Sequence, residues 1–202
     1  MIEKVLPLVT LEDKEDAKII GELLIKNGFN SAEVTYRTGA ATDVIKILSK
    51  LKNFSVGAGT ITSLEQMNEA IDAGAEFIIT PGINIPVIEE SINRNIDVYP
   101  GVVTPSEIEV CRKYGLNTLK LFPCGVFGGI DLLKSYQGPY YDFNFIPTGG
   151  VNLNNAEEFL GLKNVVSIGG SFILNYEYIK NKDWVSLDNH LKKISDKLYK
   201  YF

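Results

Sequence analysis

Residues 97–123, DVYPGVVTPSEIEVCRKYGLNTLKLFP, contain a strand-type run, a helix with its own start signal and a second strand-type run. The runs are Asp97–Tyr99 and Thr118–Phe122. Between them, the tetrapeptide TPSE at 104–107 supplies an N-cap threonine, a proline for the first helical position and a capping-box glutamate. A strand, a helix and a strand in this order predict a parallel βαβ unit.

The same alternation extends over the whole chain. Eight parallel units are what a closed barrel needs, so the sequence predicts an α/β fold of the compact (β/α)8 TIM-barrel type, with a doubly wound open sheet as the alternative. An extra C-terminal helix is expected at about Asp183 to Leu198. Without a linker-like stretch, residues 1–202 are expected to form a single domain. The β-rich runs are Val5–Val9, Ala32–Tyr36, Phe54–Gly57, Phe77–Thr80, Asp97–Tyr99, Thr118–Phe122, Asn144–Ile146 and Val165–Ile168.

Composition excludes several classes of partner. With 45% hydrophobic and 22% charged residues, the chain has the composition of an ordinary globular protein. The net charge is −5 and the arginines are only Arg37, Arg94 and Arg112, which argues against nucleic acid as a partner. No apolar run approaches the roughly 20 residues of a membrane span, and no signal sequence opens the chain. A soluble, cytoplasmic protein is expected.

Cysteine and histidine are too sparse for several kinds of catalytic site. Cys111 and Cys124 cannot build a disulfide framework and lack the spacing of a thiolate metal site. The only histidine, His190, lies in the amphipathic C-terminal stretch, where a solvated or helix-packing role is expected. A Cys/His dyad, a Ser/His/Asp triad and a histidine-bound metal are therefore disfavoured, and no metal or cofactor is expected.

Lys120 stands out because it interrupts an apolar strand-type run that Pro123 closes. Burial among apolar side chains disfavours an ammonium ion and favours the free amine, which is the nucleophilic form. The alternative is a strand-end lysine whose stem covers the core while its ammonium group reaches water. A nucleophilic amine is thus the more specific of two interpretations.

Glu33 has the parity that would place it with Lys120 inside a barrel. In the run from 32 to 37, Glu33, Thr35 and Arg37 share one face, and Val34 and Tyr36 share the other. A buried carboxylate and a buried amine are the acid/base and the nucleophile of amine chemistry. They also occur as purely structural ion pairs.

Glycine-rich segments follow several of the expected strands. GAGT at 57–60 suits a ligand that approaches the backbone, whereas TPG at 80–82 and YPG at 99–101 are equally compatible with simple turns. TGG at 148–150 and GGS at 169–171 follow the last two strands, and each precedes a helix-type segment. Many barrels bind phosphate there, through backbone N–H groups and a helix N-terminus.

These segments together resemble one known family. EVTYRT at 33–38, GAGT at 57–60, TPG at 80–82, PG at 100–101, LKLFP at 119–123, PTGG at 147–150 and IGGS at 168–171 look like the 2-keto-3-deoxy-6-phosphogluconate (KDPG) aldolases, also described as 4-hydroxy-2-oxoglutarate (KHG) aldolases. The matching segments run in order over about residues 5 to 175.

The resemblance implies a metal-independent class I aldolase and assigns roles to particular residues. Lys120 would form the Schiff base with the 2-keto carbon, C3–C4 cleavage would release pyruvate and glyceraldehyde 3-phosphate, and Glu33 would be the general acid/base. A homotrimer is also implied. The remaining substrate-binding residues would be Arg37 and Thr60 for the pyruvate carboxylate, Pro81 and Phe122 for the pocket wall, and Thr148, Gly149, Gly150, Gly170 and Ser171 for the phosphate side.

The chain differs from some relatives on the side that would hold the aldehyde and phosphate. No arginine lies near Thr10, and Gly125 stands where several relatives carry an acidic residue. Two alternative functions remain open: the sister aldolase for 2-keto-3-deoxy-6-phosphogalactonate, and a non-catalytic phosphosugar-binding barrel. The latter has no need for a buried lysine and glutamate. A metal-dependent decarboxylase or epimerase would need acidic or histidine ligands at strand ends, and the sequence shows no such set.

Overall fold

The computed structural model describes residues 2–202. Strands and helices alternate along the chain, as expected for βαβ units. The strands are β1 Val5–Val9, β2 Ser31–Thr35, β3 Ser55–Gly59, β4 Phe77–Ile79, β5 Asp97–Tyr99, β6 Gly101–Val102, β7 Thr118–Leu121, β8 Asn144–Pro147 and β9 Ile168–Gly170.

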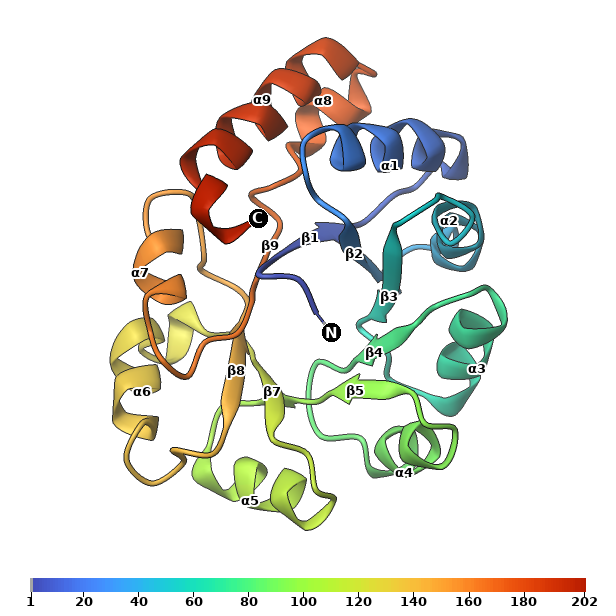
Figure 1. Cartoon of the computed structure of the whole chain (residues 1–202). Helices are drawn as coiled ribbons and strands as arrows, with labels where there is room; N and C mark the ends of the chain where they lie inside the picture. Colours follow the sequence, from blue (N-terminus) through green and yellow to red (C-terminus); the bar gives the residue numbers. More distant parts are fainter. Residues whose placement is uncertain (1) are drawn as a thin grey trace.

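The helices surround the strands. In Figure 1 the strands form a ring and the α-helices lie outside it, which excludes the doubly wound alternative, with helices on both faces of an open sheet. The α-helices are α1 Ala17–Lys26, α2 Ala41–Leu48, α3 Leu64–Asp72, α4 Ile85–Asn93, α5 Pro105–Lys113, α6 Gly129–Tyr136, α7 Ala156–Leu160, α8 Tyr176–Lys180 and α9 Trp184–Lys197; short 3-10 segments are η1 Lys14–Asp16, η2 Gly125–Phe127 and η3 Tyr199–Tyr201.

The main sheet is a curled parallel sheet of six strands in the order β5-β4-β3-β2-β1-β9. A second parallel sheet has the order β6-β7-β8. The expectation of an α/β fold is therefore confirmed. The regular ladder that a closed eight-stranded barrel requires is interrupted in two places.

The first interruption lies at Pro100, between β5 and β6. Proline has no N–H to donate to a ladder, and here the pairing partner changes from β4 to β7. The carbonyl of Pro100 nevertheless accepts a hydrogen bond of 2.9 Å from the Lys120 N–H. The second interruption separates β8 from β9, which meet through an isolated bridge between Thr148 and Gly169. The last strand also begins later than predicted, at Ile168, where pairing with Val5 starts.

Two apolar clusters fill the molecule. The larger one packs strands against helices. The smaller one lies on the inner side of the strands, because its residues share the parity of Glu33 or Lys120 in the ladders. In the smaller cluster, the rings of Phe77 and Tyr99 meet edge to face with their centroids 6.0 Å apart. Burial in this cluster fixes the inward parity of β1, β4, β5 and β8, because a shift by one residue would turn the apolar side chains outward. The buried members of the interior cluster are Leu6, Phe77, Ile79, Tyr99 and Ile146.

The capping box predicted at residues 104–107 is present, and a further side-chain cap starts α3. Glu107 accepts a hydrogen bond of 2.7 Å from the N–H of Thr104, and Pro105 is the first residue of α5. Ser63 accepts a bond of 3.2 Å from the N–H of Gln66 at the start of α3. These caps satisfy N–H groups that a helix start leaves unpaired.

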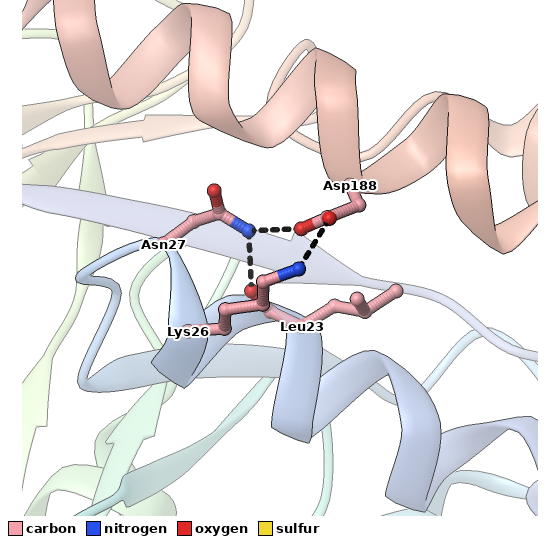
Figure 2. A network of polar contacts seen from close by, with 4 residues as sticks. All are labelled: Leu23, Lys26, Asn27 and Asp188. Atoms are coloured by element: carbon pink, nitrogen blue, oxygen red, sulfur yellow. Dashed lines mark hydrogen bonds and ion pairs between the residues drawn. The ribbon is translucent and has the colours of Figure 1, made fainter.

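The predicted C-terminal helix is confirmed as α9, which packs beside α1. Figure 2 shows the polar network that joins the two helices. Asn27 donates from Nδ2 to the Leu23 carbonyl at 2.8 Å and to Oδ1 of Asp188 at 2.9 Å. Lys26 completes the network through an ion pair with Oδ2 of Asp188. Asp188 therefore accepts hydrogen bonds from the side chains of two consecutive residues at the end of α1, Lys26 and Asn27.

Replacing Asp188 with alanine is expected to lower the free energy of unfolding by about 0.5–1 kcal/mol near neutral pH, because two side-chain bonds are lost. The Lys26 ammonium and then the Asn27 amide hold the pKa of Asp188 below its ordinary value of 3.8. A carboxyl group whose pKa is lowered in the folded state stabilises the protein at pH values above its ordinary pKa. This stabilisation is lost as the pH falls through the pKa of the folded state. Urea denaturation of both proteins at neutral and acid pH should show this difference shrinking in acid.

Asp196→Ala is the matched control, because Asp196 lies exposed on the same helix. It should change stability little at either pH. A loss in Asp188→Ala that is equally large in acid would contradict the assigned ion pair.

Candidate active site

Lys120 and Glu33 meet inside the ring of strands. Lys120 Nζ lies 3.0 Å from Glu33 Oε1, and the residues are 3% and 1% exposed. Lys120 comes from β7 and Glu33 from β2, which are not neighbours in either sheet, so the pair crosses the interior. The inward parity predicted for both residues is found, and the exposed ammonium group of the alternative interpretation is not. An ion pair so deeply buried is retained only where the geometry is good.

Glu33 has one oxygen without a protein partner. Oε1 receives the Lys120 bond, whereas the buried Oε2 has no hydrogen-bond partner among residues 2–202. A buried carboxylate oxygen without a partner is unusual in folded proteins and is found at catalytic positions. This oxygen is available to exchange a proton with a molecule that reaches Lys120.

The glycines of β3 make room for side chains from neighbouring strands. A Cβ atom at Gly57 would lie 2.0 Å from the Phe77 ring, and one at Gly59 would lie 2.0 Å from Glu33 Oε1. The sequence interpretation, a backbone left open for a ligand, is corrected here. Gly59 leaves the space that the Glu33 carboxylate occupies, because Glu33 must bend across β3 to reach Lys120.

Gly59→Ala is expected to reduce kcat about tenfold and to lower stability by about 1–3 kcal/mol, because the new methyl group displaces a carboxylate that has little room to move. Turnover and urea denaturation measure the two effects. Gly138→Ala is the control, since a Cβ there meets nothing within 4 Å. A Gly59→Ala protein with unchanged turnover would show that the position of the Glu33 carboxylate does not matter.

Thr60 follows Gly59 with an unusual backbone conformation. Its φ is +60°, a left-handed value that is rare for a β-branched residue. Such conformations concentrate at ligand sites, where the surrounding structure imposes them. Ile61 continues the chain by donating its N–H to the Ile79 carbonyl at 3.2 Å. The strained backbone at Thr60 therefore lies where β3 ends, next to the Glu33 carboxylate.

Pro81 and Phe122 lie on the β4 and β7 sides of the site. The Phe122 ring centroid is 5.3 Å from Lys120 Nζ, a cation–π distance. Pro81 packs against the next strand so tightly that a Cβ at Gly101 would lie 2.2 Å from the Pro81 carbonyl oxygen. Glycine is therefore required at position 101, because the backbones of Pro81 and Gly101 pack closely.

The glycines after β8 lie beside the segment that follows β7. Gly149 and Gly150 have φ of +83° and +89°, and the Gly149 carbonyl accepts a bond of 2.8 Å from the N–H of Gly125. Within the described chain, neither Gly149 nor Gly150 donates its N–H to a backbone acceptor. Thr148 is buried and donates its N–H to Leu121 at 3.0 Å. Two N–H groups are thus left for an anion.

A pocket of about 690 Å³ opens at the ends of β1, β2 and β9. Of the predicted site residues, only Arg37 and Ser171 line it, whereas the Lys120–Glu33 pair is buried and is not part of its lining. Leu8, which lies opposite Glu33 in the β1–β2 ladder, also lines the pocket and connects the two regions. The remaining lining residues are Thr10, Leu11, Glu12, Asp13, Asp16, Tyr176, Glu177, Ile179, Lys180 and Lys182.

A hydroxyl network at this pocket was not predicted from the sequence. The Tyr176 hydroxyl bonds to backbone groups at the end of β1, and Thr10 Oγ1 lies 2.7 Å from Thr35 Oγ1. Burial raises the pKa of Tyr176, with smaller opposing effects from Thr10 and Arg37. No local sequence pattern marks Tyr176, because its partners lie 166 and 168 residues away.

Cys124, which follows Pro123 at the end of β7, has a buried side chain. Burial raises the pKa of Cys124 to about 12, so its side chain stays a thiol at neutral pH. Within residues 2–202, no group of three or more His, Cys, Asp or Glu side chains is arranged to hold a metal ion. No helix of that part of the chain is long and apolar enough to cross a membrane.

The chain is similar in sequence and in structure to known aldolases. The sequence model of the KDPG and KHG aldolase family matches residues 2–189. The chain is 32% identical to the 2-dehydro-3-deoxy-phosphogluconate aldolase of Haemophilus influenzae over 194 residues, which make up 96% of this chain and 92% of the relative.

Two solved structures are closely similar. The KDPG aldolase of Legionella pneumophila, with pyruvate captured at low pH as a covalent carbinolamine intermediate, has a TM-score of 0.91 at 34% identity and covers 95% of this chain and 94% of its own. The KDPG aldolase of Zymomonas mobilis with 3-phosphoglycerate has a TM-score of 0.89 at 30% identity and covers 96% and 91%. The predicted assignment to the metal-independent class I lyases is confirmed, and the chain belongs to the KDPG and KHG aldolase family.

Proposed function

We propose that this chain cleaves KDPG to pyruvate and glyceraldehyde 3-phosphate, and also cleaves KHG to pyruvate and glyoxylate. The observation that carries the proposal is the buried contact of 3.0 Å between Lys120 Nζ and Glu33 Oε1. The pair supplies an amine and a proton acceptor in one apolar enclosure, which Schiff-base chemistry requires. The covalent carbinolamine with pyruvate in the Legionella relative supports the same chemistry here.

The reaction begins when the proton of the Lys120 ammonium group moves to Glu33. The free amine then attacks the C2 carbonyl and forms a carbinolamine. Glu33 returns its proton to the hydroxyl of this carbinolamine, which leaves as water and gives the iminium ion. A proton passes from the C4 hydroxyl to Glu33, the C3–C4 bond breaks, and its electron pair moves towards the iminium nitrogen. The aldehyde departs, the enamine is protonated at C3, and water releases pyruvate.

The pyruvate half of the substrate would be held near Arg37 and Thr60. Arg37 takes part in none of the ion pairs among the described residues, and it lines the pocket together with Leu8. Its planar fork can bind a carboxylate through two hydrogen bonds. Pro81 and Phe122 would bound the pyruvyl group, with the Phe122 ring beside the amine.

The phosphate half would lie across the ends of β8 and β9. We assign it to Thr148, Gly149, Gly150, Gly170 and Ser171. Among these, the N–H groups of Gly149, Gly150 and Ser171 have no backbone acceptor within the described chain. Backbone N–H groups at glycines are suited to binding a dianion, because no side chain blocks its approach to the backbone.

The two sheets are proposed to act as one closed eight-stranded barrel, in a single domain of residues 1–202. Two contacts support closure: the bridge between Thr148 and Gly169 joins β8 to β9, and Pro100 accepts from Lys120 where β5 passes into β6. Counting β5 and β6 as one strand gives the eight strands of the expected fold.

A homotrimer is proposed from the family resemblance. The 3-10 segment after β7 exposes two apolar side chains, Val126 at 81% and Phe127 at 53%, which would be covered in an assembly. Light scattering of the purified protein should give a mass three times that of the 22.4 kDa chain. A monomer mass would overturn this assignment.

The proposed activity is tested by measuring pyruvate release from three candidate substrates: KDPG, KHG and 2-keto-3-deoxy-6-phosphogalactonate. Turnover of KDPG with the highest kcat/KM, at or above about 10⁴ M⁻¹s⁻¹, is the expected result. A preference for the galactonate substrate would assign the chain to the sister specificity. Folded protein that binds KDPG but releases no pyruvate would support the non-catalytic binding barrel.

A further inference from the structure

The ladder between β1 and β9 ends before β1 does: its last pair is Pro7 with Gly170, whereas β1 continues to Val9. Val5 pairs with Ile168 and Pro7 with Gly170, and Ile168 donates its N–H to Lys4 at 2.9 Å. In a parallel ladder the next rung would join the Leu8 carbonyl and the Thr10 N–H to the backbone of residue 172. β9 ends at Gly170 instead. The Leu8 carbonyl of β1, the Thr10 N–H just after β1 and the backbone of residue 172 therefore need other partners.

One side-chain hydroxyl replaces the missing rung on β1. Tyr176 donates from its hydroxyl to the Leu8 carbonyl at 3.0 Å and accepts from the Thr10 N–H at 2.9 Å. These are the two backbone groups that the continued strand would have satisfied. Because Tyr176 begins α8, its hydroxyl also fixes the start of that helix against the end of β1.

A histidine replaces the missing rung on the other side. The carbonyl of Phe172 accepts a hydrogen bond of 3.0 Å from His190 Nε2 on α9. The Phe172 ring folds back over the end of β9, since a Cβ at Gly170 would lie 2.3 Å from it. The backbone of Phe172 therefore bonds to α9 and not to β1. Ser171, which precedes it, is exposed.

The displaced segment borders the pocket. Ser171 and Arg37 line it, as do Thr10 and Tyr176 from the two sides of the missing rung. Within residues 2–202, the N–H groups of Ser171 and Phe172 have no backbone acceptor. Had the ladder continued, residue 172 would have occupied the place of the tyrosine hydroxyl, and the N–H of Phe172 would have been used within the sheet.

We propose that Tyr176 and His190 are positioning residues that hold the Ser171–Phe172 backbone apart from the end of β1, in the geometry that receives the substrate's phosphate group. This inference rests on the proposed function and adds the residues that shape its phosphate side. Neither side chain is assigned contact with the substrate. Each acts through the backbone that it holds, Tyr176 through β1 and His190 through Phe172.

The first test is Tyr176→Phe, which removes the hydroxyl and keeps the ring. The KM for KDPG should rise about three- to tenfold, the effect expected for losing neutral hydrogen bonds that place a binding loop. The kcat should stay within twofold, about the scatter of such measurements. The kcat/KM for 2-keto-3-deoxygluconate, the same substrate without its phosphate, should not change.

The matched control is Tyr178→Phe. Tyr178 lies on the same helix, and its ring packs against the His190 ring with centroids 6.2 Å apart. Its hydroxyl makes no hydrogen bond within the described chain, so both substrates should be cleaved as in the unmodified protein. For His190, glutamine keeps a donor and should retain the KM for KDPG, whereas leucine should raise it as Tyr176→Phe does.

Two results would overturn the inference. Equal losses with both substrates, together with a lower unfolding midpoint, would mean that Tyr176 only stabilises the fold. Unchanged kinetics with both would mean that the hydroxyl positions nothing. If the unmodified protein cleaves neither substrate, the proposed function fails separately, and calorimetric binding of inorganic phosphate decides: weaker binding by Tyr176→Phe supports the inference and equal binding overturns it.

Discussion

Replacing Lys120 with methionine is expected to lower kcat/KM for KDPG by at least about 10⁴-fold, because no other group can form the covalent intermediate. Methionine has a similar length and suits the apolar surroundings of Lys120, so the chain should still fold. The variant also leaves Glu33 buried without its partner, which is expected to lower the free energy of unfolding by about 3 kcal/mol. Pyruvate release and urea denaturation measure the two effects.

The double variant Lys120→Met with Glu33→Gln separates the two consequences. It replaces both charges, so it should recover most of the lost stability while remaining inactive. An active Lys120→Met protein would refute the assigned nucleophile. A double variant that is no more stable than the single one would show that the buried carboxylate was not the source of the loss.

Glu33→Gln should reduce kcat by about 10²- to 10⁴-fold, the usual contribution of a positioned acid/base. The amide keeps the shape of the carboxylate and an oxygen that can accept from Lys120, but it cannot take up a proton. The KM should change little, because the side chain is assigned to proton transfer and not to holding the substrate. Steady-state kinetics with KDPG over a range of pH provide the measurement.

The structural ion-pair interpretation predicts a different result for this variant. If Glu33 only stabilised Lys120, Glu33→Gln would lower the unfolding midpoint and leave kcat within a few-fold of the original value. Gln66→Ala, at the start of α3 and outside the site, is a comparison variant that removes two side-chain hydrogen bonds without touching the Lys120 pair. It should affect stability alone.

Much of the fold could be predicted from the sequence because its signals are local. The capping residues before α5 act within one helical turn, and the two inward-facing residues Glu33 and Lys120 follow from strand parity. Alternating strands and helices also gave the α/β class. The interruption at Pro100 was not predicted, although proline cannot donate to a ladder. The change of partner strand from β4 to β7 depends on contacts between distant segments, such as the bond from the Lys120 N–H to the Pro100 carbonyl.

The candidate site was only partly accessible to sequence reasoning. Gly59 was interpreted as space for a ligand, whereas that space is occupied by the Glu33 side chain, a contact between strands that no single segment specifies. Tyr176 and His190 were not connected to the site for a similar reason. Their partners, the end of β1 and Phe172, become neighbours only when the last strand stops at Gly170.

The central claim is that the amine of Lys120 forms the covalent bond to the substrate. Borohydride reduction of the purified protein in the presence of pyruvate, followed by peptide mass analysis, tests it most directly, with Lys120→Met as the control. The predicted result is a reduced pyruvyl adduct on the peptide that contains Lys120, absent from the control. Folded protein that gives no adduct under conditions that label a known class I aldolase, or gives one on another lysine, would contradict the account.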